Sequence, residues 1–332
     1  MTRPELCILN HSQIASILTF EGAIDAVQRV MMAHGRGEVV PPNLLHADVP
    51  QGEFHIKTGG VLHPAGAEVF GLKANGGFFG NQEQGLPNFV GVIYLADAQT
   101  GCPVAVLDSV EISRVRTGAA TAVAARHLAR PESEVVTVVG TGTQARTQIE
   151  ALTHVLPIRR ARLVGRDLSR TKARAALFEE SLGIPVEGYA SVTDAMKGAD
   201  VLVTCTPARR PMVSLSDVPA GTFIAAVGAD SPGKQELATE LVAQCTVVAD
   251  VLHQCVHVGE LQHPIEAGLL TAEQVHGELG GVLCGMASGR TCEEEITLFD
   301  STGTALQDVA VGSEVLRRAL EAGVGIRVDL GA

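Results

Sequence analysis

The sequence predicts an α/β fold with two parts: a doubly wound parallel sheet of the Rossmann type and a smaller α+β domain. After residue 130, apolar segments such as VVTVVG and TFIAAVG alternate with helical segments, which is the pattern of a parallel sheet covered by helices. Between residues 53 and 108, short strands follow one another with turn signals and without helices, which is typical of an antiparallel meander. We therefore expect one unit of each kind in this chain of 332 residues.

The first part begins with a predicted helix over 1–35, which has an apolar stripe and ends at glycines. Pro41-Pro42 predicts a break, and AQTG at 98–101 predicts a hairpin turn. The alanine-rich segment 111–129 predicts a helix, and 304–323 predicts a long amphipathic helix. The predicted strands of this part are 53–62, 69–79, 88–97 and 102–108.

The second part is predicted from alternating elements. Its strands are expected at 135–140, 161–165, 201–206, 222–228 and 246–250. Its helices are expected at 143–155, 169–182 and 234–243.

Composition narrows the class of protein. Hydrophobic residues make up 46% of the chain and charged ones 19%, as in soluble globular enzymes. The net charge of −12 argues against a nucleic-acid or anionic-membrane partner. The seven cysteines are odd in number and contain no C-x-x-C, which indicates reduced thiols. We expect a cytoplasmic protein without a membrane span, since no apolar stretch is long enough.

A glycine-rich turn follows the apolar strand VVTVVG. Gly140-x-Gly142-x-x-Ala145 lies between a predicted strand and a predicted helix, which is the context that the dinucleotide fingerprint requires. The glycines permit a tight turn, and the helix N-terminus favours a pyrophosphate. We expect Gly140, Gly142, Thr143 and Gln144 to bind a dinucleotide, although a similar turn occurs in unrelated α/β proteins.

The end of the next strand predicts which nicotinamide cofactor is preferred. An acidic residue there binds a ribose 2′-hydroxyl, and an arginine accommodates a 2′-phosphate. Here Gly165 occupies the usual acidic place and Arg166 follows it, which favours NADP(H) and leaves NAD(H) possible. Asp167 is the counter-argument, because it could bind a 2′-hydroxyl in a shifted register.

GEFHIKTGG, at 52–60, places an imidazole and an ammonium two residues apart. In a strand, His55 and Lys57 therefore point to the same side, and we expect them to bind substrate. The alternatives are a solvent-facing lysine and a half-buried structural histidine.

A metal site is not expected. His253, Cys255, His257 and His263 lie close in sequence, but H-x-C-x-H fits no standard zinc spacing.

Several long motifs, in order, resemble one family. They are SRVRTGAATAVAARHLA (113–129), VVGTGTQA (138–145), AVGADSPGKQEL (226–237), VGELQHPIEAG (258–268) and EITLFDSTGTALQDVAV (295–311). The chain resembles the ornithine cyclodeaminase/μ-crystallin family, which includes alanine dehydrogenase and imino-acid reductases. The resemblance implies a homodimer and a split substrate-binding and dimerisation domain, 1–118 with 305–332, around a dinucleotide-binding domain, 119–304.

The resemblance also implies roles for individual residues. Lys73 matches a lysine that contacts the substrate, Arg116 an arginine that clamps its carboxylate, and Asp230 a catalytic acid/base, with Lys234 holding its loop. Positions near the cofactor are Thr117, Thr204, Thr206, Val227 and Ser301.

The residues themselves are compatible with these roles. Lys73 lies in an apolar strand, where a lysine needs a partner. Arg116 is expected to open a helix, where an anion is favoured; the alternative is a surface arginine. Asp230 follows an apolar strand, where a carboxyl can shuttle a proton; the alternative is a helix-capping turn.

Two departures from the family affect the expected substrate. Asn43 stands where many members have an arginine, and His55 stands near the place of the cyclodeaminase glutamate. A basic pair would repel the distal ammonium of ornithine. The sequence therefore predicts NAD(P)H-dependent reduction of an imino acid; the alternatives are ornithine cyclodeaminase and a non-enzymatic binding protein.

Overall fold

The computed structural model describes residues 5–62, 68–78 and 80–331. The chain divides into two compact units. Unit 1 is Met1–Arg116 with Thr304–Ala332, and unit 2 is Thr117–Gly303.

Unit 1 is built on a seven-stranded sheet in the order β17-β1-β6-β5-β4-β3-β2. The expected antiparallel meander is present in β2 to β6, and β1 adds a parallel pair with β6. The strands are β1 (Leu6–Leu9), β2 (Val39–Val49), β3 (Gly52–Val61), β4 (Val69–Gly77), β5 (Phe89–Asp97), β6 (Pro103–Asp108) and β17 (Ile326–Val328).

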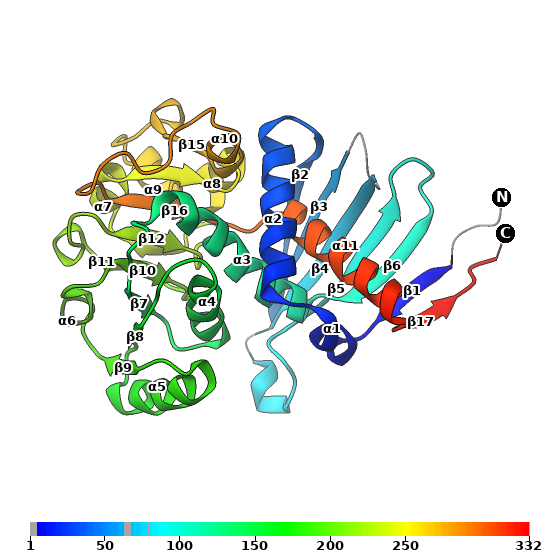
Figure 1. Cartoon of the computed structure of the whole chain (residues 1–332), viewed down its shortest axis with the longest axis horizontal. Coiled ribbons are helices and arrows are strands. Elements are labelled where there is room, and N and C mark those ends of the chain that lie inside the picture. The colour runs from blue at the N-terminus through cyan, green and yellow to red at the C-terminus, as the bar shows by residue number, and fades with distance from the viewer. Residues whose placement is uncertain (1–4, 63–67, 79, 332) are drawn as a thin grey trace. The chain divides into compact units, whose positions relative to one another are not determined.

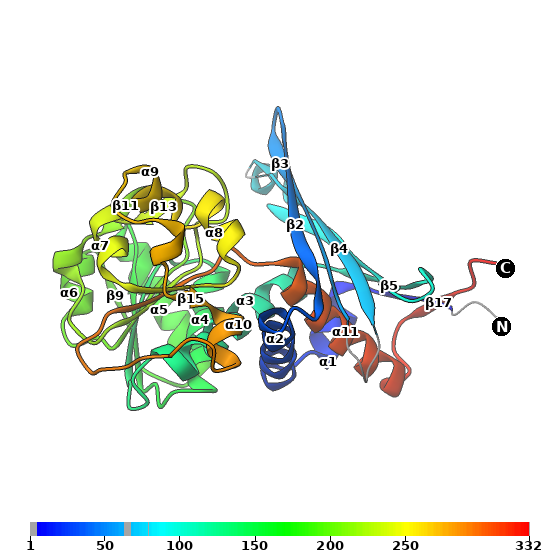
Figure 2. The same ribbon diagram turned by 90° about the horizontal axis from the view of Figure 1, so that it is seen from above.

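Helices cover one face of this sheet. Figures 1 and 2 both show α2 (Phe20–Gly35) and α11 (Ala305–Ala322) along the same side, with α1 (His11–Ile17) nearby. A glycine makes the approach of α11 possible, because a Cβ at Gly71 would lie 2.6 Å from Val309 Cγ2. The opposite face carries exposed apolar side chains at Leu45, Phe54, Val90 and Val92.

Two expectations for the N-terminal part were wrong. Among residues 5–35, strand β1, the short helix α1 and the 16-residue helix α2 take the place of one helix over 1–35. Strand β2 runs through Pro41-Pro42, with an irregular register between Val40 and Asn43. Prolines are tolerated there because β2 is the edge strand, where a missing N–H breaks no central ladder.

Unit 2 is a parallel, doubly wound sheet, as expected. Its eight strands run in the order β15-β14-β16-β12-β10-β7-β8-β9, and every neighbouring pair is parallel. The strands are β7 (Val135–Val139), β8 (Arg160–Val164), β9 (Val186–Tyr189), β10 (Val201–Thr204), β12 (Phe223–Ala226), β14 (Thr246–Ala249), β15 (Gly277–Glu278) and β16 (Thr297–Asp300).

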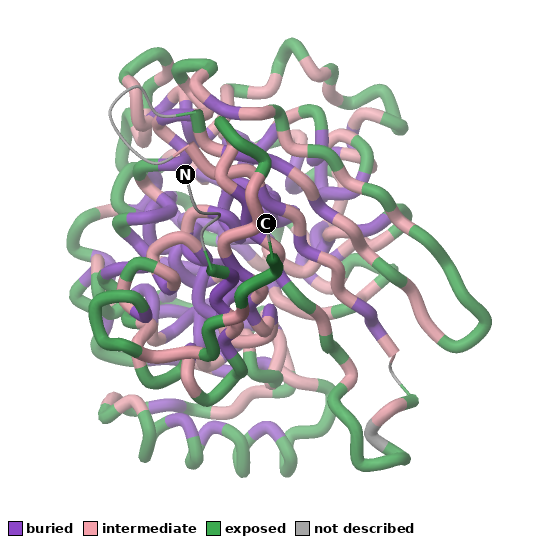
Figure 3. Tube along the Cα trace, turned by 90° about the vertical axis from the view of Figure 1, so that its right-hand side faces the viewer, coloured by how far each residue is buried: buried purple, intermediate pink, exposed green. Residues whose placement is uncertain are grey.

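The helices of unit 2 connect these strands. They are α4 (Thr143–Thr153), α5 (Leu168–Leu182), α6 (Val192–Met196), α7 (Thr239–Gln244), α8 (Leu252–Val258), α9 (Gln262–Glu266) and α10 (Leu279–Leu283), and α3 (Val110–Leu128) spans the division between the units. In Figure 3 the buried stretches lie inside and the exposed ones are mainly loops and outer helix turns. The predicted helix over 234–243 was wrong in its first half, because β13 (Gln235–Leu237) pairs with β11 (Arg209–Val213) before α7 begins.

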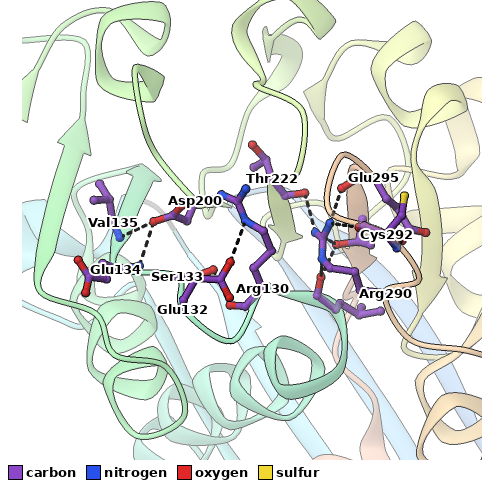
Figure 4. A network of polar contacts seen from close by, with 12 residues as sticks. Arg130, Glu132, Ser133, Glu134, Val135, Asp200, Thr222, Arg290, Cys292 and Glu295 are labelled. Carbon is purple, nitrogen blue, oxygen red and sulfur yellow. Dashed lines mark hydrogen bonds and ion pairs between the residues drawn. The ribbon is translucent and has the colours of Figure 1, made fainter.

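A polar network closes the amino-terminal edge of the unit 2 sheet (Figure 4). Asp200 accepts hydrogen bonds from the backbone N–H groups of Glu134 and Val135, and Arg130 donates to it at 2.7 Å. Arg290 donates to the Thr222 carbonyl and to the Thr297 hydroxyl. The starts of β7, β10, β12 and β16 are thereby held together.

A chain of buried carboxylates organises the opposite, carboxyl-terminal edge. Asp300 accepts from the N–H groups of Glu260 and Leu261, and Glu260 in turn accepts from Glu236 and Leu237. Glu236 accepts from Thr206 N–H at 2.6 Å and from Gly228 N–H at 3.0 Å. Each carboxylate thus fixes the backbone that carries the next one, and the last fixes the loops after β10 and β12.

Burial of these carboxylates makes the stability of the fold depend on pH. Burial raises the pKa of Glu236 from 4.5 to about 7, and hydrogen bonds from Thr206, Thr204 and Gly228 oppose the shift. The folded pKa lies above the unfolded one, so the stabilisation is complete below pH 4.5 and is lost as the pH rises to about 7.

We expect Glu236→Gln to flatten this part of the stability profile. Glutamine resembles the protonated acid, so the decrease in the free energy of unfolding between pH 4.5 and 7 should shrink by on the order of 3 kcal/mol. Urea unfolding at several pH values measures it. Glu240→Gln, which changes an exposed glutamate of α7, is the control. An unchanged slope in Glu236→Gln would show that Glu236 is ionised throughout this range in the folded protein.

Candidate active site

A buried cluster of charges lies in unit 1 between the sheet and α11. Lys73 of β4 and Arg116 of α3 share one carboxylate, Asp308 of α11. Lys73 Nζ lies 2.7 Å from Asp308 Oδ2, and Arg116 Nε lies 3.0 Å from Oδ1. All three residues are at most 7% exposed. Such a carboxylate fixes the direction of both cations.

Lys57 adds a further cation to this cluster. It is 4% exposed and lies directly opposite Lys73 in the β3–β4 ladder. Neighbouring residues opposite each other on a sheet have their Cβ atoms about 5 Å apart. Lys57 is therefore not a solvent-facing lysine, which was the alternative that the sequence left open.

The electrostatics of the cluster are unbalanced. Burial lowers the pKa of Lys73 from 10.5 to about 7; Asp308 opposes this, and Arg116 and Lys57 add to it. Burial tends to raise the pKa of Asp308, but Lys73 and Arg116 outweigh it and the pKa is lowered. Three basic side chains thus act on the carboxylate of Asp308, and an added anion would be stabilised beside them.

Gln307 provides a second indication of an anion site. Its Oε1 accepts from Arg116 at 2.9 Å, so its amide nitrogen points elsewhere. That nitrogen is buried and has no hydrogen-bond partner among the described residues. A buried N–H donor without an acceptor is costly, and a ligand carboxylate would satisfy it.

Sequence reasoning missed two members of the cluster and misplaced a third. Asp308 and Gln307 were not selected, although both fall within the buried stripe of the predicted helix 304–323. A carboxylate on an apolar helix face requires a partner, and that signal was available. Arg116 was expected to open its helix, but α3 begins at Val110, so a helix N-terminus does not explain its setting.

His55 lies on the same face of β3 as Lys57 but has other contacts. Its Nε2 lies 3.0 Å from His46 Nδ1 and 3.5 Å from Glu53 Oε1. His55 is opposite Asn75 on β4, and the next same-face pair along the ladder is Lys57 with Lys73. The two basic residues that the sequence placed together therefore belong to different groups: His55 contacts His46 and Glu53, and Lys57 lies beside Lys73.

In unit 2, Asp230 lies on the loop after β12. Lys234 Nζ donates to its Oδ1 at 2.5 Å. The loop is tied down from α9, because Gln262 accepts from Gly233 N–H and His263 contacts the Lys234 carbonyl at 2.7 Å. Asp230 is partly exposed and its loop is fixed, an arrangement that suits proton transfer.

The glycine turn of unit 2 has the geometry of a phosphate site. Gly140 has φ 131°, and a Cβ there would lie 2.8 Å from Cys205 Sγ, so only glycine fits. Gly142 caps α4 without a side-chain hydrogen bond, and a Cβ there would have nothing within 4 Å. No side chain or backbone therefore crowds the Gly142 side of the α4 N-terminus, which is the end of a helix that favours an anion.

The remaining predicted cofactor positions follow strands of the same sheet, except Thr117 on α3. Thr204 ends β10, and Val227 N–H donates to its carbonyl at 2.9 Å. Thr206 N–H is held by Glu236, and Ser301 N–H donates to the Ala226 carbonyl. Ligands of doubly wound sheets bind at this carboxyl-terminal edge.

Arg166 is exposed directly after β8. A Cβ at Gly165 would collide with Thr171 Oγ1, so the usual acidic position cannot carry a side chain without a rearrangement. Asp167 caps α5, with its Oδ1 accepting from Arg170 N–H at 3.0 Å. The counter-argument from Asp167 is thereby weakened, because one of its oxygens is engaged.

The four residues rejected as a metal site have separate contacts. Cys255 Sγ donates to Asp250, His263 contacts the Lys234 carbonyl, and His253 meets His257 edge to face with ring centroids 5.3 Å apart. In the described part of the chain, no helix combines the length and apolarity that a membrane crossing requires.

Three solved structures are similar over almost the whole chain. An archaeal alanine dehydrogenase dimer with bound NAD is 35% identical, with a TM-score of 0.92, covering 98% of this chain and 100% of that one. The iminosuccinate reductase of Paracoccus denitrificans with NAD⁺ is 32% identical, with a TM-score of 0.91 and the same coverage. The Thermococcus litoralis Δ(1)-pyrroline-2-carboxylate reductase with NADH and L-proline is 29% identical, with a TM-score of 0.91, covering 97% and 100%.

The family model agrees with these similarities. It matches residues 20–323, which include the charge cluster of unit 1, the glycine turn and the Asp230 loop. The chain belongs to the ornithine cyclodeaminase/mu-crystallin family.

Proposed function

We propose that this protein is an NAD(P)H-dependent oxidoreductase that reduces the C=N bond of an imino acid and, in reverse, oxidises the amino acid. The observation that carries this proposal is the unit 1 cluster, in which the buried side chains of Lys57, Lys73 and Arg116 gather at the carboxylate of Asp308. An imino acid brings the carboxylate that such a cluster accepts. The similar alanine dehydrogenase, iminosuccinate reductase and pyrroline-2-carboxylate reductase act on substrates of this class.

The nicotinamide cofactor belongs to unit 2, which serves as the dinucleotide-binding domain. Gly140, Gly142, Thr143 and Gln144 fit a pyrophosphate at the start of α4, and Thr117, Thr204, Thr206, Val227 and Ser301 are the further cofactor positions. The bound cofactor supplies a hydride, and the protein positions the acceptor carbon and provides the proton.

Unit 1 serves as the substrate-binding domain. Arg116 and Lys73 bind the substrate carboxylate, and Asp308 holds both cations in place. The Gln307 amide donates a further hydrogen bond. Lys57 adds positive charge, and His55 lies further along the same strand face, on the side of the substrate side chain.

Asp230 acts as the acid/base. Its carboxyl group gives a proton to the substrate nitrogen on reduction and takes it back on oxidation. Lys234 keeps this carboxyl oriented through the ion pair at 2.5 Å.

The basic character of the site favours a simple or dicarboxylic imino acid. Ornithine has a second ammonium, and Lys57 and His55 do not offer it the carboxylate that it needs. The exception is Glu53, on the same face of β3 and 3.5 Å from His55 Nε2. Ornithine cyclodeaminase therefore stays the second candidate, favoured by this one acidic side chain.

A substrate panel tests the activity. We expect the protein to oxidise NADPH in the presence of pyruvate or oxaloacetate with ammonia, or of a cyclic imino acid, and to be less active with L-ornithine and NAD. Absorbance of the reduced cofactor measures the rate. Formation of proline from ornithine, without cofactor oxidation by any imine, would contradict the reductase assignment.

A variant separates the chemical step from binding. Asp230→Asn should lower kcat by roughly 10²- to 10⁴-fold, the usual contribution of a general acid/base, with unchanged affinity for NADPH. Asp194→Asn, at an exposed aspartate of α6, is the matched control.

We further propose that NADP(H) is the preferred cofactor and that NAD(H) is also used. Arg166 is exposed at the strand end, Gly165 leaves no room for a side chain, and Asp167 is engaged as a cap. The solved relatives named above contain NAD(H), so the preference is a property of this chain's own strand end.

Arg166→Ala tests the preference. We expect the KM for NADPH to rise about 10-fold or more, since a charge-assisted hydrogen bond to phosphate is lost, while the KM for NADH changes less than about 2-fold. Arg174→Ala, further along α5, is the control. Equal changes with both cofactors would contradict the assignment.

The protein is proposed to form a homodimer in the cytoplasm. The uncovered face of the unit 1 sheet exposes Leu45, Phe54, Val90 and Val92, and apolar patches of this kind mark interfaces. The similar archaeal alanine dehydrogenase is a dimer. None of the seven cysteines, all of which the structure describes, forms a disulfide, as is usual in a reducing compartment. Sedimentation as a monomer would contradict the dimer.

A further inference from the structure

Three potential metal ligands converge on the hairpin formed by β2 and β3. His46 is directly opposite His55 in the ladder, and Asp48 is opposite Glu53 at the next same-face pair. His46, Glu53 and His55 each offer one ligand atom, and these atoms all lie within 4.8 Å of one another. All three residues are partly buried, and the β2–β3 ladder fixes the backbone positions that carry them.

Two of the three separations between ligand atoms are close to those of a tetrahedral metal site, and the third is within 4.8 Å. Zinc binds imidazole nitrogen and carboxylate oxygen at 2.0 to 2.2 Å, so neighbouring ligand atoms of a tetrahedron stand about 3.3 Å apart. His46 Nδ1 and His55 Nε2 are 3.0 Å apart, and His55 Nε2 and Glu53 Oε1 are 3.5 Å apart. Small movements of these side chains would place all three atoms around one ion.

Asp48 supplies the outer contact that a ligating histidine requires. A metal-bound imidazole usually donates its other N–H to a carboxylate, which fixes the tautomer. His46 Nε2 lies 3.0 Å from Asp48 Oδ1. With the proton on Nε2, His46 Nδ1 accepts the hydrogen bond from His55 Nε2, and an ion would take the place of the shared proton. His55 needs only to move its proton from Nε2 to Nδ1.

We propose that His46, Glu53 and His55 form a binding site for a transition-metal ion of the zinc class, with Asp48 orienting His46. Two imidazoles and one carboxylate suit Zn²⁺, Co²⁺ or Ni²⁺, whereas Mg²⁺ and Ca²⁺ prefer oxygen ligands. Three protein ligands leave a fourth position for water or for a ligand. This site includes His55, which the proposed function places on the side of the substrate side chain, but metal binding there does not require the reductase activity.

The sequence did not predict this site. The residues that suggest a metal site from the sequence lie at 253–263, where histidines and a cysteine are close together in the chain. His46 and His55 come together only through the register of β2 and β3, which the break expected at Pro41-Pro42 concealed.

Binding of Co²⁺ to the intact chain tests the proposal. We expect one Co²⁺ per chain, with the visible d–d absorption of a tetrahedral ion and without a thiolate charge-transfer band, because no cysteine is a ligand. Zn²⁺ should displace the Co²⁺ and raise the unfolding temperature; Mg²⁺ and Ca²⁺ should do neither.

Variants locate the ion. His55→Gln should abolish the Co²⁺ spectrum, and Asp48→Asn should weaken binding by roughly 10- to 100-fold, as outer-contact losses do. Asp48 is 85% exposed, so its replacement leaves the fold intact. His257→Gln is the matched control, because it makes the same substitution in the edge-to-face His253–His257 pair of α8, outside the proposed site.

The outcomes are distinct. Loss of the ion in His55→Gln and its retention in His257→Gln supports the proposal. Absence of stoichiometric binding, loss in His257→Gln alone, or a thiolate band would overturn it. None of these readouts involves imine reduction, so a failure of the proposed activity would be recognised separately.

Discussion

Asp308 is the residue on which the unit 1 site depends. Its two oxygens hold Lys73 and Arg116, which come from a strand and a helix far from it in sequence. Without this carboxylate, three buried cations would repel one another in a place from which water is excluded. With this carboxylate, the cluster can be buried and still carries more positive than negative charge, so it favours the binding of an anion.

Unit 2 buries carboxylates where unit 1 buries cations, and backbone N–H groups stabilise them. Glu236, Glu260 and Asp300 are buried, and each carboxylate accepts hydrogen bonds from two backbone N–H groups. Amides balance a carboxylate without adding a second charge. The loops after β10 and β12, with Thr206 and Asp230, therefore rest on a scaffold whose strength depends on pH.

The fold class and most elements could be predicted because their signals are local. The glycine turn, the alternating strands and helices of unit 2, and the amphipathic helix 304–323 each require only a short stretch of sequence. The failures were non-local. β13 pairs with the distant strand β11 and its Glu236 and Leu237 N–H groups bond to Glu260, and the contact of His46 with His55 depends on strand register. Asp308 could have been found, since a carboxylate on an apolar helix face is a visible anomaly.

The most direct test of the anion site is the pKa of Lys73, measured by NMR of the labelled amine with and without a small carboxylate ligand. The structure predicts a pKa of about 7 in the free protein, because burial, Arg116 and Lys57 outweigh Asp308. Binding of a carboxylate should raise it, since the added anion favours the ammonium form. A pKa near 10.5 that does not change with the ligand would contradict the account.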